Sequence, residues 1–157
     1  LCNVETFDGR GDIVEFNHDA IVIGPGPGRP EISPLSMHAA SLDMPVLGIC
    51  LGHQAIGLAR GMELVESPLG PVHGVPSTIV ADGNGLLSKG EHVMTRYNSL
   101  VLRGDGDILV TANDETGTLP MEIRDGNTYG LQFHPESIGS SGGMEVLSEF
   151  LRRIAHC

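Results

Sequence analysis

One short segment narrows the possible folds more than any other. Residues 47–57 read LGICLGHQAIG, so Cys50 stands between Gly48 and Gly52, after an apolar run and before a helical pattern. A strand that turns directly into a helix brings backbone too close for a Cβ atom, and glycine relieves that contact. The form G-x-Cys-x-G is typical of such turns, which hold a nucleophile above a parallel sheet. The segment therefore predicts an α/β fold with Cys50 at the end of a strand.

Two interpretations of this cysteine stay open on the segment alone. At a helix N-terminus a thiol pKa falls and the reactive thiolate is favoured. The backbone N–H of Leu51 would then point the same way and form half of an oxyanion hole. A buried cysteine can also act simply as a small hydrophobic residue in a glycine-rich turn. The nucleophile interpretation needs a base.

That base is predicted in GLQFHPES, residues 130–137, where His134 and Glu136 stand two apart. In an extended segment both side chains share one face, and Pro135 keeps His134 out of helical geometry. A histidine can take the cysteine proton, and a carboxylate can fix its tautomer. Taken alone, His134 is explained as a core histidine near a strand end, and Glu136 as a charge at the start of a helix. Together, at the ends of parallel strands, they favour a catalytic group of Cys50, His134 and Glu136.

A third glycine cluster, GPGPGRP at residues 24–30, follows an apolar run. It is not a G-x-G-x-x-G motif, and its prolines remove N–H groups that would hold a pyrophosphate. A rigid loop that lets backbone approach a small ligand is the better interpretation. The N–H of Gly26 is then the candidate for the second oxyanion donor.

Apolar runs that alternate with helical patterns indicate an open, mostly parallel sheet with helices on both faces. The polar, broken segments of the 75–128 region indicate a small antiparallel sheet in addition. The expected strands are 1–7, 20–24, 45–49, 77–82, 91–98, 107–115, 119–130 and 129–135, and the expected helices are 34–43, 52–61 and 142–154.

Composition limits the classes of function. The 157 residues fit one domain, and a net charge of −11 without a basic stripe argues against nucleic-acid binding. No apolar run approaches the roughly 20 residues of a membrane span, and the first residues do not form a secretory signal. Three separated cysteines, without a CxxC motif, favour neither disulfides nor zinc. We expect a soluble cytoplasmic protein.

Five motifs in order resemble the class I, triad-type glutamine amidotransferases, and within them the glutaminase component of anthranilate synthase and aminodeoxychorismate synthase. They are GPGPGRP, GICLGHQAIG, HG at 73–74, TRYNSL and GLQFHPES, and they extend over nearly the whole chain. The resemblance implies a flavodoxin-like glutaminase fold with no cofactor or metal of its own. Magnesium is expected only in a partner, a chorismate-using synthase that is either a separate chain or a fused domain.

The resemblance also implies roles for individual residues. Cys50 attacks the side-chain amide of glutamine, His134 moves the proton and Glu136 orients His134. Ammonia leaves, and water hydrolyses the thioester to glutamate. The oxyanion hole comes from Gly26 and Leu51, and the substrate is held by Gly26, Pro27, Gly28, Leu51, Gln54 and the backbone of Ser99 and Leu100.

The chain departs from the family pattern in three places. The first strand and helix of the family, with their NYDSF-like turn, are absent, so we expect residues 1–157 to be an N-terminally incomplete glutaminase domain. The family usually has a lysine or arginine after HG, where this chain has Val75. It usually reads YHSL, where this chain has Asn98. The last two departures bear on the partner more than on the chemistry.

Other functions stay open. The glutaminase of carbamoyl-phosphate synthesis shares a GxCLGHQ turn, although RYNSL favours the chorismate branch. A non-catalytic regulatory module of the same fold would predict a broken triad. A peptidase or γ-glutamyl hydrolase that acts alone is disfavoured by the glutamine-specific loop residues. Nothing in the sequence separates anthranilate from aminodeoxychorismate as the product.

Overall fold

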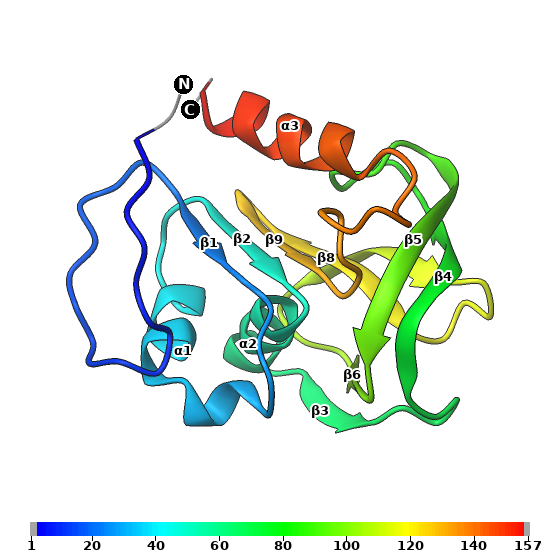
Figure 1. Ribbon diagram of the computed structural model, residues 1–157, viewed down its shortest axis with the longest axis horizontal. Coiled ribbons are helices and arrows are strands. Elements are labelled where there is room, and N and C mark those ends of the chain that lie inside the picture. The colour runs from blue at the N-terminus through cyan, green and yellow to red at the C-terminus, as the bar shows by residue number, and fades with distance from the viewer. Residues whose placement is uncertain (1–2, 156–157) are drawn as a thin grey trace.

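The structure is a computed structural model, in which residues 3–155 are described. Its main sheet has seven strands in the order β1-β2-β9-β8-β7-β4-β5 (Figure 1). The bounds of these strands are β1 Ile21–Ile23, β2 Val46–Ile49, β4 Val72–Ala81, β5 Gly90–Asn98, β7 Leu109–Asp114, β8 Pro120–Asp125 and β9 Thr128–Leu131. A second sheet pairs β3 (Glu63–Glu66) with β6 (Leu100–Arg103).

The main sheet is mixed. Strands β1, β2 and β9 are parallel, and β9, β8, β7, β4 and β5 continue the sheet in antiparallel pairs. The predicted α/β class is confirmed. The antiparallel strands of the 75–128 region extend the main sheet, because β8 turns tightly into β9 and pairs with it. The separate small antiparallel sheet is the β3–β6 pair.

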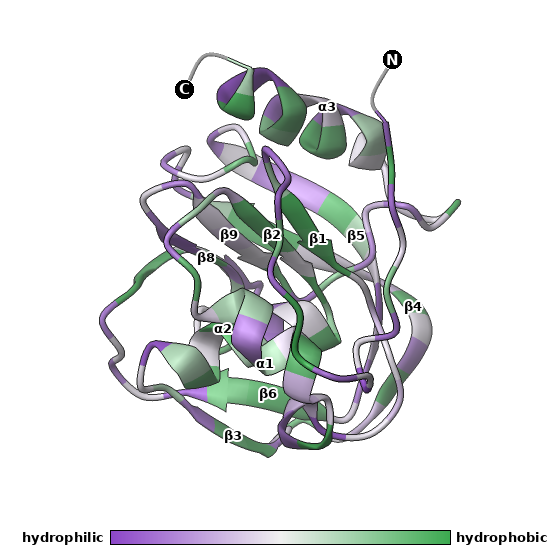
Figure 2. Cartoon of the chain, turned by 90° about the vertical axis from the view of Figure 1, so that its left-hand side faces the viewer, coloured by the Kyte–Doolittle hydropathy of each residue, from purple (hydrophilic) through white to green (hydrophobic). Residues whose placement is uncertain are grey.

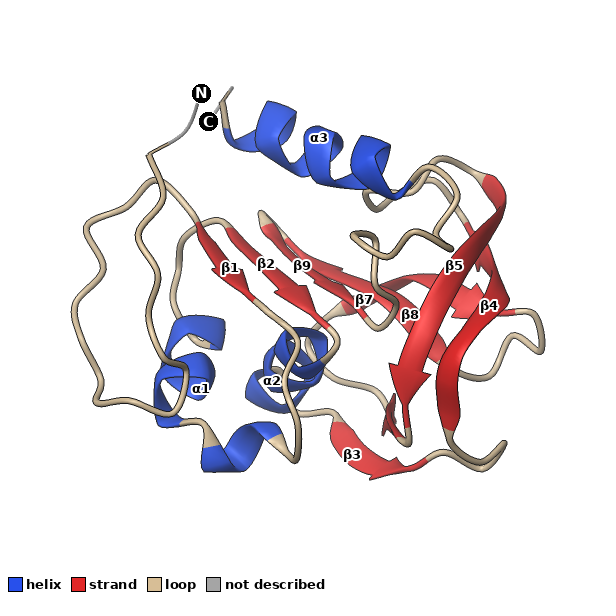
Figure 3. Cartoon of the chain, viewed as in Figure 1, coloured by secondary structure: helices blue, strands red, loops and turns tan. Residues whose placement is uncertain are grey.

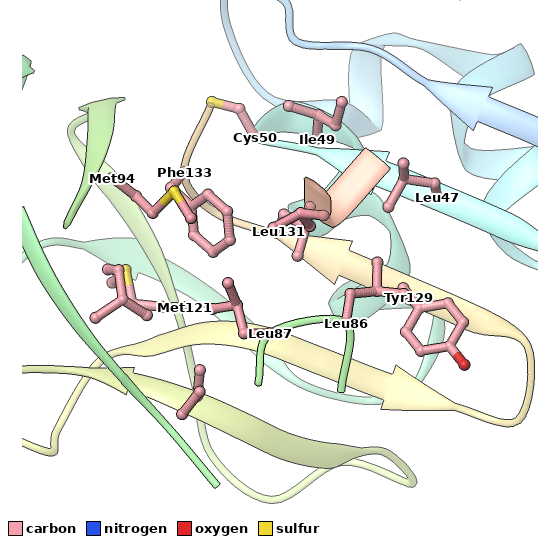
Figure 4. Packing of buried hydrophobic residues seen from close by; sticks show 14 of the residues in the cluster. Leu47, Ile49, Cys50, Leu86, Leu87, Met94, Met121, Tyr129, Leu131 and Phe133 are labelled. Carbon is pink, nitrogen blue, oxygen red and sulfur yellow. The ribbon is translucent and has the colours of Figure 1, made fainter. Parts of the chain in front are cut away.

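Helices cover both faces of the parallel strands, as predicted. Figures 1 and 2 show α3 (Gly143–Ile154) on one face and α1 (Pro34–Ala40) and α2 (Leu51–Ala59) on the other. A 3₁₀ turn, η1 (Pro30–Ile32), precedes α1. Each face has its own apolar cluster. Phe150 of α3 packs with Tyr129 and Leu131 of β9, which are both labelled in Figure 4. Ile56 of α2 packs with Val46 and Ile23.

The strand predicted for residues 1–7 is wrong within the described residues. Leu1 and Cys2 lie outside them, and residues 3–7 belong to a long segment without regular structure that leads to β1 (Figure 3). The aromatic side chains of this segment pack on each other, with the Phe7 and Phe16 rings 5.5 Å apart and edge to face. Val4 is 81% exposed, so the apolar residues of the 3–7 segment are only partly buried, and the segment forms no strand.

Candidate active site

Cys50 lies on a strained turn between β2 and α2. Its φ is 53°, and it is the only non-glycine residue in the described part of the chain with a positive φ. A Cβ on Gly48 would lie 2.4 Å from the backbone of Gly52, and one on Gly52 would lie 2.3 Å from the carbonyl of Ile23. The N–H of Cys50 donates to the carbonyl of Leu131 at 2.8 Å, which ties the turn to β9. The predicted strand-to-helix turn is therefore present.

The state of the thiol differs from the prediction. Cys50 is 7% exposed, at the edge of the apolar cluster beside Phe133 (Figure 4). Burial raises the pKa of the thiol to about 11, and the hydrogen bond from the Leu51 backbone offsets this only in part. The expected lowering of the pKa by the helix N-terminus is wrong for the free protein, because desolvation of the sulfur is the larger effect. At neutral pH the sulfur carries its proton.

His134 and Glu136 are hydrogen-bonded to each other, with Nδ1 of the histidine 2.8 Å from Oε1 of the glutamate. The predicted strand 129–135 ends at Leu131, so the same-face argument for this contact is wrong. A turn makes the contact instead, since the N–H of Ser137 donates to the carbonyl of His134 at 3.1 Å. With Nδ1 turned to the carboxylate, Nε2 is the free nitrogen. It is buried and has no hydrogen-bond partner among the described residues.

Tyr97 lies between the cysteine and the histidine. Its carbonyl is 4.0 Å from the sulfur of Cys50, which donates to it, and its ring stands edge-on to His134 with centroids 5.0 Å apart. The charge of Glu136 adds to the rise in the thiol pKa, so the carboxylate acts on the sulfur as well. The fold thus brings the three predicted triad residues together around one tyrosine.

The predicted oxyanion residues are neighbours too. A Cβ on Gly26 would lie 3.3 Å from Cδ1 of Leu51, so the loop after β1 rests against the first residue of α2. Arg10 donates to the carbonyl of Pro27 at 3.1 Å, and Gly28 has a φ of 86° that other residues rarely adopt. The loop therefore touches α2 at Gly26 and accepts a hydrogen bond at Pro27, which suits a backbone that must approach a ligand.

The remaining predicted substrate residues are Gln54 on α2 and, where β5 leads into β6, Ser99 and Leu100. The amide nitrogen of Gln54 donates to the carbonyl of Leu100 at 3.3 Å, and the side chain of Asn98 donates to the same oxygen at 3.0 Å. The carbonyl of Ser99 accepts from the N–H of Ser67 at 2.8 Å. These two carbonyls are therefore engaged within the protein.

The two departures from the family pattern have different positions. Val75 is 50% exposed on β4, where a partner can touch it. Asn98 is buried, and its side-chain oxygen accepts from Nε of Arg96 at 3.2 Å. Asn98 therefore supports the backbone beside the site from within.

Gln132 is a residue of the site that sequence reasoning missed. Its side-chain nitrogen lies 3.8 Å from the sulfur of Cys50 and donates to it, and its oxygen accepts from the amide of Gln54 at 3.3 Å. Gln132 is fully buried. The available signal was its position two residues before His134 in the same motif.

The structure gives no sign of a metal centre, since no three His, Cys, Asp or Glu side chains cluster suitably between residues 3 and 155. Over the same range, no helix is long and apolar enough to cross a membrane.

Comparisons with known proteins identify the family of the chain. The family described as Glutamine amidotransferase class-I matches residues 2–154. Anthranilate synthase component 2 of Cyanophora paradoxa is 36% identical, over 89% of this chain and 78% of that protein. The fold and the cysteine turn define a class I glutaminase type of α/β domain. The chain belongs to the class I glutamine amidotransferases.

Two longer relatives contain a similar region. The bifunctional protein TrpGD of Thermotoga maritima is 38% identical over 96% of this chain, which spans 28% of that protein. The aminodeoxychorismate synthase of Streptomyces pristinaespiralis is 40% identical over 84% of this chain, which spans 19% of it. The chain thus spans less than a third of each of these two relatives.

Two solved structures support the fold. A crystal structure of a protein from Thermoplasma acidophilum, described as part of a GMP synthase, superposes with a TM-score of 0.77 at 19% identity, over 89% of this chain and 74% of that one. A glutamine amidotransferase from Thermotoga maritima superposes with a TM-score of 0.65 at 18% identity, over 88% of this chain and 63% of that one. At these identities the likeness concerns the fold alone.

Proposed function

We propose that this domain hydrolyses the side-chain amide of glutamine through a Cys50 thioester and delivers the ammonia to a chorismate-using synthase. The observation that carries the proposal is the strained turn that holds Cys50 against Tyr97, which also contacts the His134–Glu136 pair. Relatives named anthranilate synthase component 2 and aminodeoxychorismate synthase support the choice of partner. That partner is either a separate chain or a domain of the same chain.

The chemistry begins with a proton transfer. Because burial keeps the thiol protonated, its proton must pass to a base as the sulfur attacks, and Nε2 of His134 is free to take it. Glu136 stabilises the resulting imidazolium through Nδ1. The sulfur bonds to the amide carbon, and the N–H groups of Leu51 and Gly26 receive the negative oxygen.

The second half releases the products. His134 returns its proton to the amide nitrogen, which leaves as ammonia and breaks the C–N bond. Water, deprotonated by His134, then attacks the thioester, so that glutamate leaves and the Cys50 thiol is restored. No group beyond those of the domain, glutamine and water is needed.

The proposal is tested by Cys50→Ala in the protein together with its cognate synthase, chorismate and magnesium. Synthesis from glutamine should fall to background, and synthesis from ammonium salts should be unchanged, because the synthase site is untouched. Product is measured with each nitrogen source. Loss of both activities would mean that Cys50 is structural or needed for docking, and retention of both would mean that it is a bystander.

A carbamoyl-phosphate synthase is the second candidate partner, since the role of ammonia supplier does not depend on chorismate. The same pair of assays with bicarbonate and ATP distinguishes it. The matches to anthranilate and aminodeoxychorismate synthases favour the chorismate branch.

A further inference from the structure

We propose that Gln132 is a catalytic residue of this site: its side-chain amide donates a hydrogen bond to the sulfur of Cys50 and stabilises the thiolate that attacks the substrate. The proposal rests on the function proposed above and assigns a side-chain donor to its nucleophile, in addition to the backbone N–H of Leu51, which bonds the sulfur in the free protein.

The orientation of the Gln132 amide is set by a chain of hydrogen bonds that starts at the backbone. The carbonyl of Leu100 can only accept, so the group of Gln54 that faces it, at 3.3 Å, must be the nitrogen. The same nitrogen donates to Gln132 at 3.3 Å, so the group that receives this bond must be the oxygen. The nitrogen of Gln132 is then the atom that faces the sulfur, at 3.8 Å.

Burial makes the opposite orientation costly. Gln132 is fully buried and Gln54 is 4% exposed, so no bulk water is at hand to satisfy an amide that is turned the wrong way. A flipped Gln132 would put two amide nitrogens against each other and an oxygen against the sulfur. The backbone is fixed as well, since the N–H of Gln132 donates to the carbonyl of Met121 at 2.9 Å.

The sulfur needs such a donor. The carbonyl of Tyr97 faces it from one side and the carboxylate of Glu136 acts on it from another, and both disfavour a negative sulfur. When the proton passes to Nε2 of His134, the electron pair stays on sulfur in a buried setting. A preformed N–H that points at this atom stabilises the charge without reorganisation.

The arrangement also joins the nucleophile to the substrate side of the site. Leu100 and Gln54 are predicted to hold the glutamine, and their bond is the one that orients Gln132. A shift of the Leu100 backbone would thus change the orientation of the Gln54 amide and, through it, that of the Gln132 amide at the sulfur.

The test measures the alkylation of Cys50 by iodoacetamide against pH, with peptide mapping that follows Cys2 and Cys157 as reference thiols. Gln132→Met and Gln132→Leu remove the donor at similar volume. We expect a rate at pH 8 about tenfold lower than in the wild type, with the midpoint of the profile moved to higher pH. The kcat for glutamine should fall by a similar factor, with KM nearly unchanged.

Two further variants separate the donor from a merely structural role. Gln54→Leu loosens the same chain of bonds but keeps the amide of Gln132, so its alkylation rate should fall less than that of Gln132→Met. Thr128→Val changes a buried polar residue of β9, the strand that ends just before Gln132, and should keep the wild-type profile.

The outcome for Gln132 is separable from that for the proposed function. The assignment is overturned if folded Gln132→Met has the alkylation profile of the wild type. It is also overturned if Gln54→Leu lowers the alkylation rate as much as Gln132→Met does. Both results hold even where glutamine hydrolysis is normal. If the wild type does not hydrolyse glutamine, but Gln132→Met still changes the alkylation profile, the proposed function is overturned and the Gln132–sulfur bond remains supported.

Discussion

At the residue scale, the base and the nucleophile of this site are held separately. His134 is fixed by Glu136 at Nδ1, whereas its Nε2 makes no hydrogen bond to any described residue, and the thiol of Cys50 donates to the carbonyl of Tyr97. The free protein is therefore in a resting state with a neutral sulfur. The reaction requires the thiol to turn from the carbonyl to the imidazole.

This arrangement predicts unequal effects within the triad. His134→Asn removes the only proposed proton carrier, so kcat for glutamine hydrolysis should fall about 10⁴-fold. Glu136→Gln keeps a hydrogen-bond partner for Nδ1 but removes the charge, so a loss of about 10²-fold is expected. Steady-state kinetics on variants with wild-type melting temperatures provides the measurement. A fully active Glu136→Gln would show that something else orients His134.

The sequence predicts those site residues whose side-chain type already indicates one chemical role. Cysteine, histidine and glutamate in glycine-rich and proline-bounded motifs were sufficient to propose the triad. Gln132 could not be predicted in this way, because an amide serves either as donor or as acceptor, and the choice is made by the carbonyl of Leu100. The raised pKa of the thiol was equally hidden, since it depends on burial by residues distant in sequence.

At the scale of elements, the site depends on how closely α2 approaches β1 and β2. Gly48 and Gly52 have no room for a Cβ, and their obstacles are backbone atoms that cannot move aside. Strands β1 and β2 and all three helices were predictable, because their apolar patterns are continuous or their ends carry glycine and proline, although β1 is an edge strand on which Val22 is 59% exposed. The end of β9 was not, since Gln132 and Phe133 are buried like strand residues but belong to a bend.

Gly52→Ala tests this close approach. The new Cβ would lie 2.3 Å from the carbonyl of Ile23 and 2.9 Å from its Cβ, so α2 must move away from β1. We expect a loss of about 3 kcal/mol in the free energy of unfolding and loss of Cys50 reactivity, measured by denaturant unfolding and alkylation. Gly24→Ala is the control for stability, because nothing lies within 4 Å of its added Cβ. Equal stability of the two variants would contradict the packing.

At the scale of the whole molecule, one buried group makes stability depend on pH. His53 of α2 is fully buried, and neither ring nitrogen has a hydrogen-bond partner among the described residues. Burial lowers the pKa of His53 to about 4, and the nearby backbone of Gly130 offsets this only in part. The folded protein therefore holds this histidine neutral, whereas the unfolded chain takes up a proton near the usual value of 6.5.

The sign of the effect follows from that difference in bound protons. Between pH 6.5 and pH 4 the unfolded state binds more protons than the folded state, so the stability should fall as the pH falls through this window. Against His53→Met, which cannot titrate, the wild type should lose up to about 3 kcal/mol across it. Urea unfolding at several pH values gives the comparison, and taking the difference removes shared contributions such as that of Glu122, whose buried carboxyl has a raised pKa. His73→Gln, a change at an exposed histidine, should keep the wild-type dependence. Parallel curves for the wild type and His53→Met would mean that the fold accommodates a charged His53, and that α2 packs less tightly on its face of the sheet than the burial of His53 indicates.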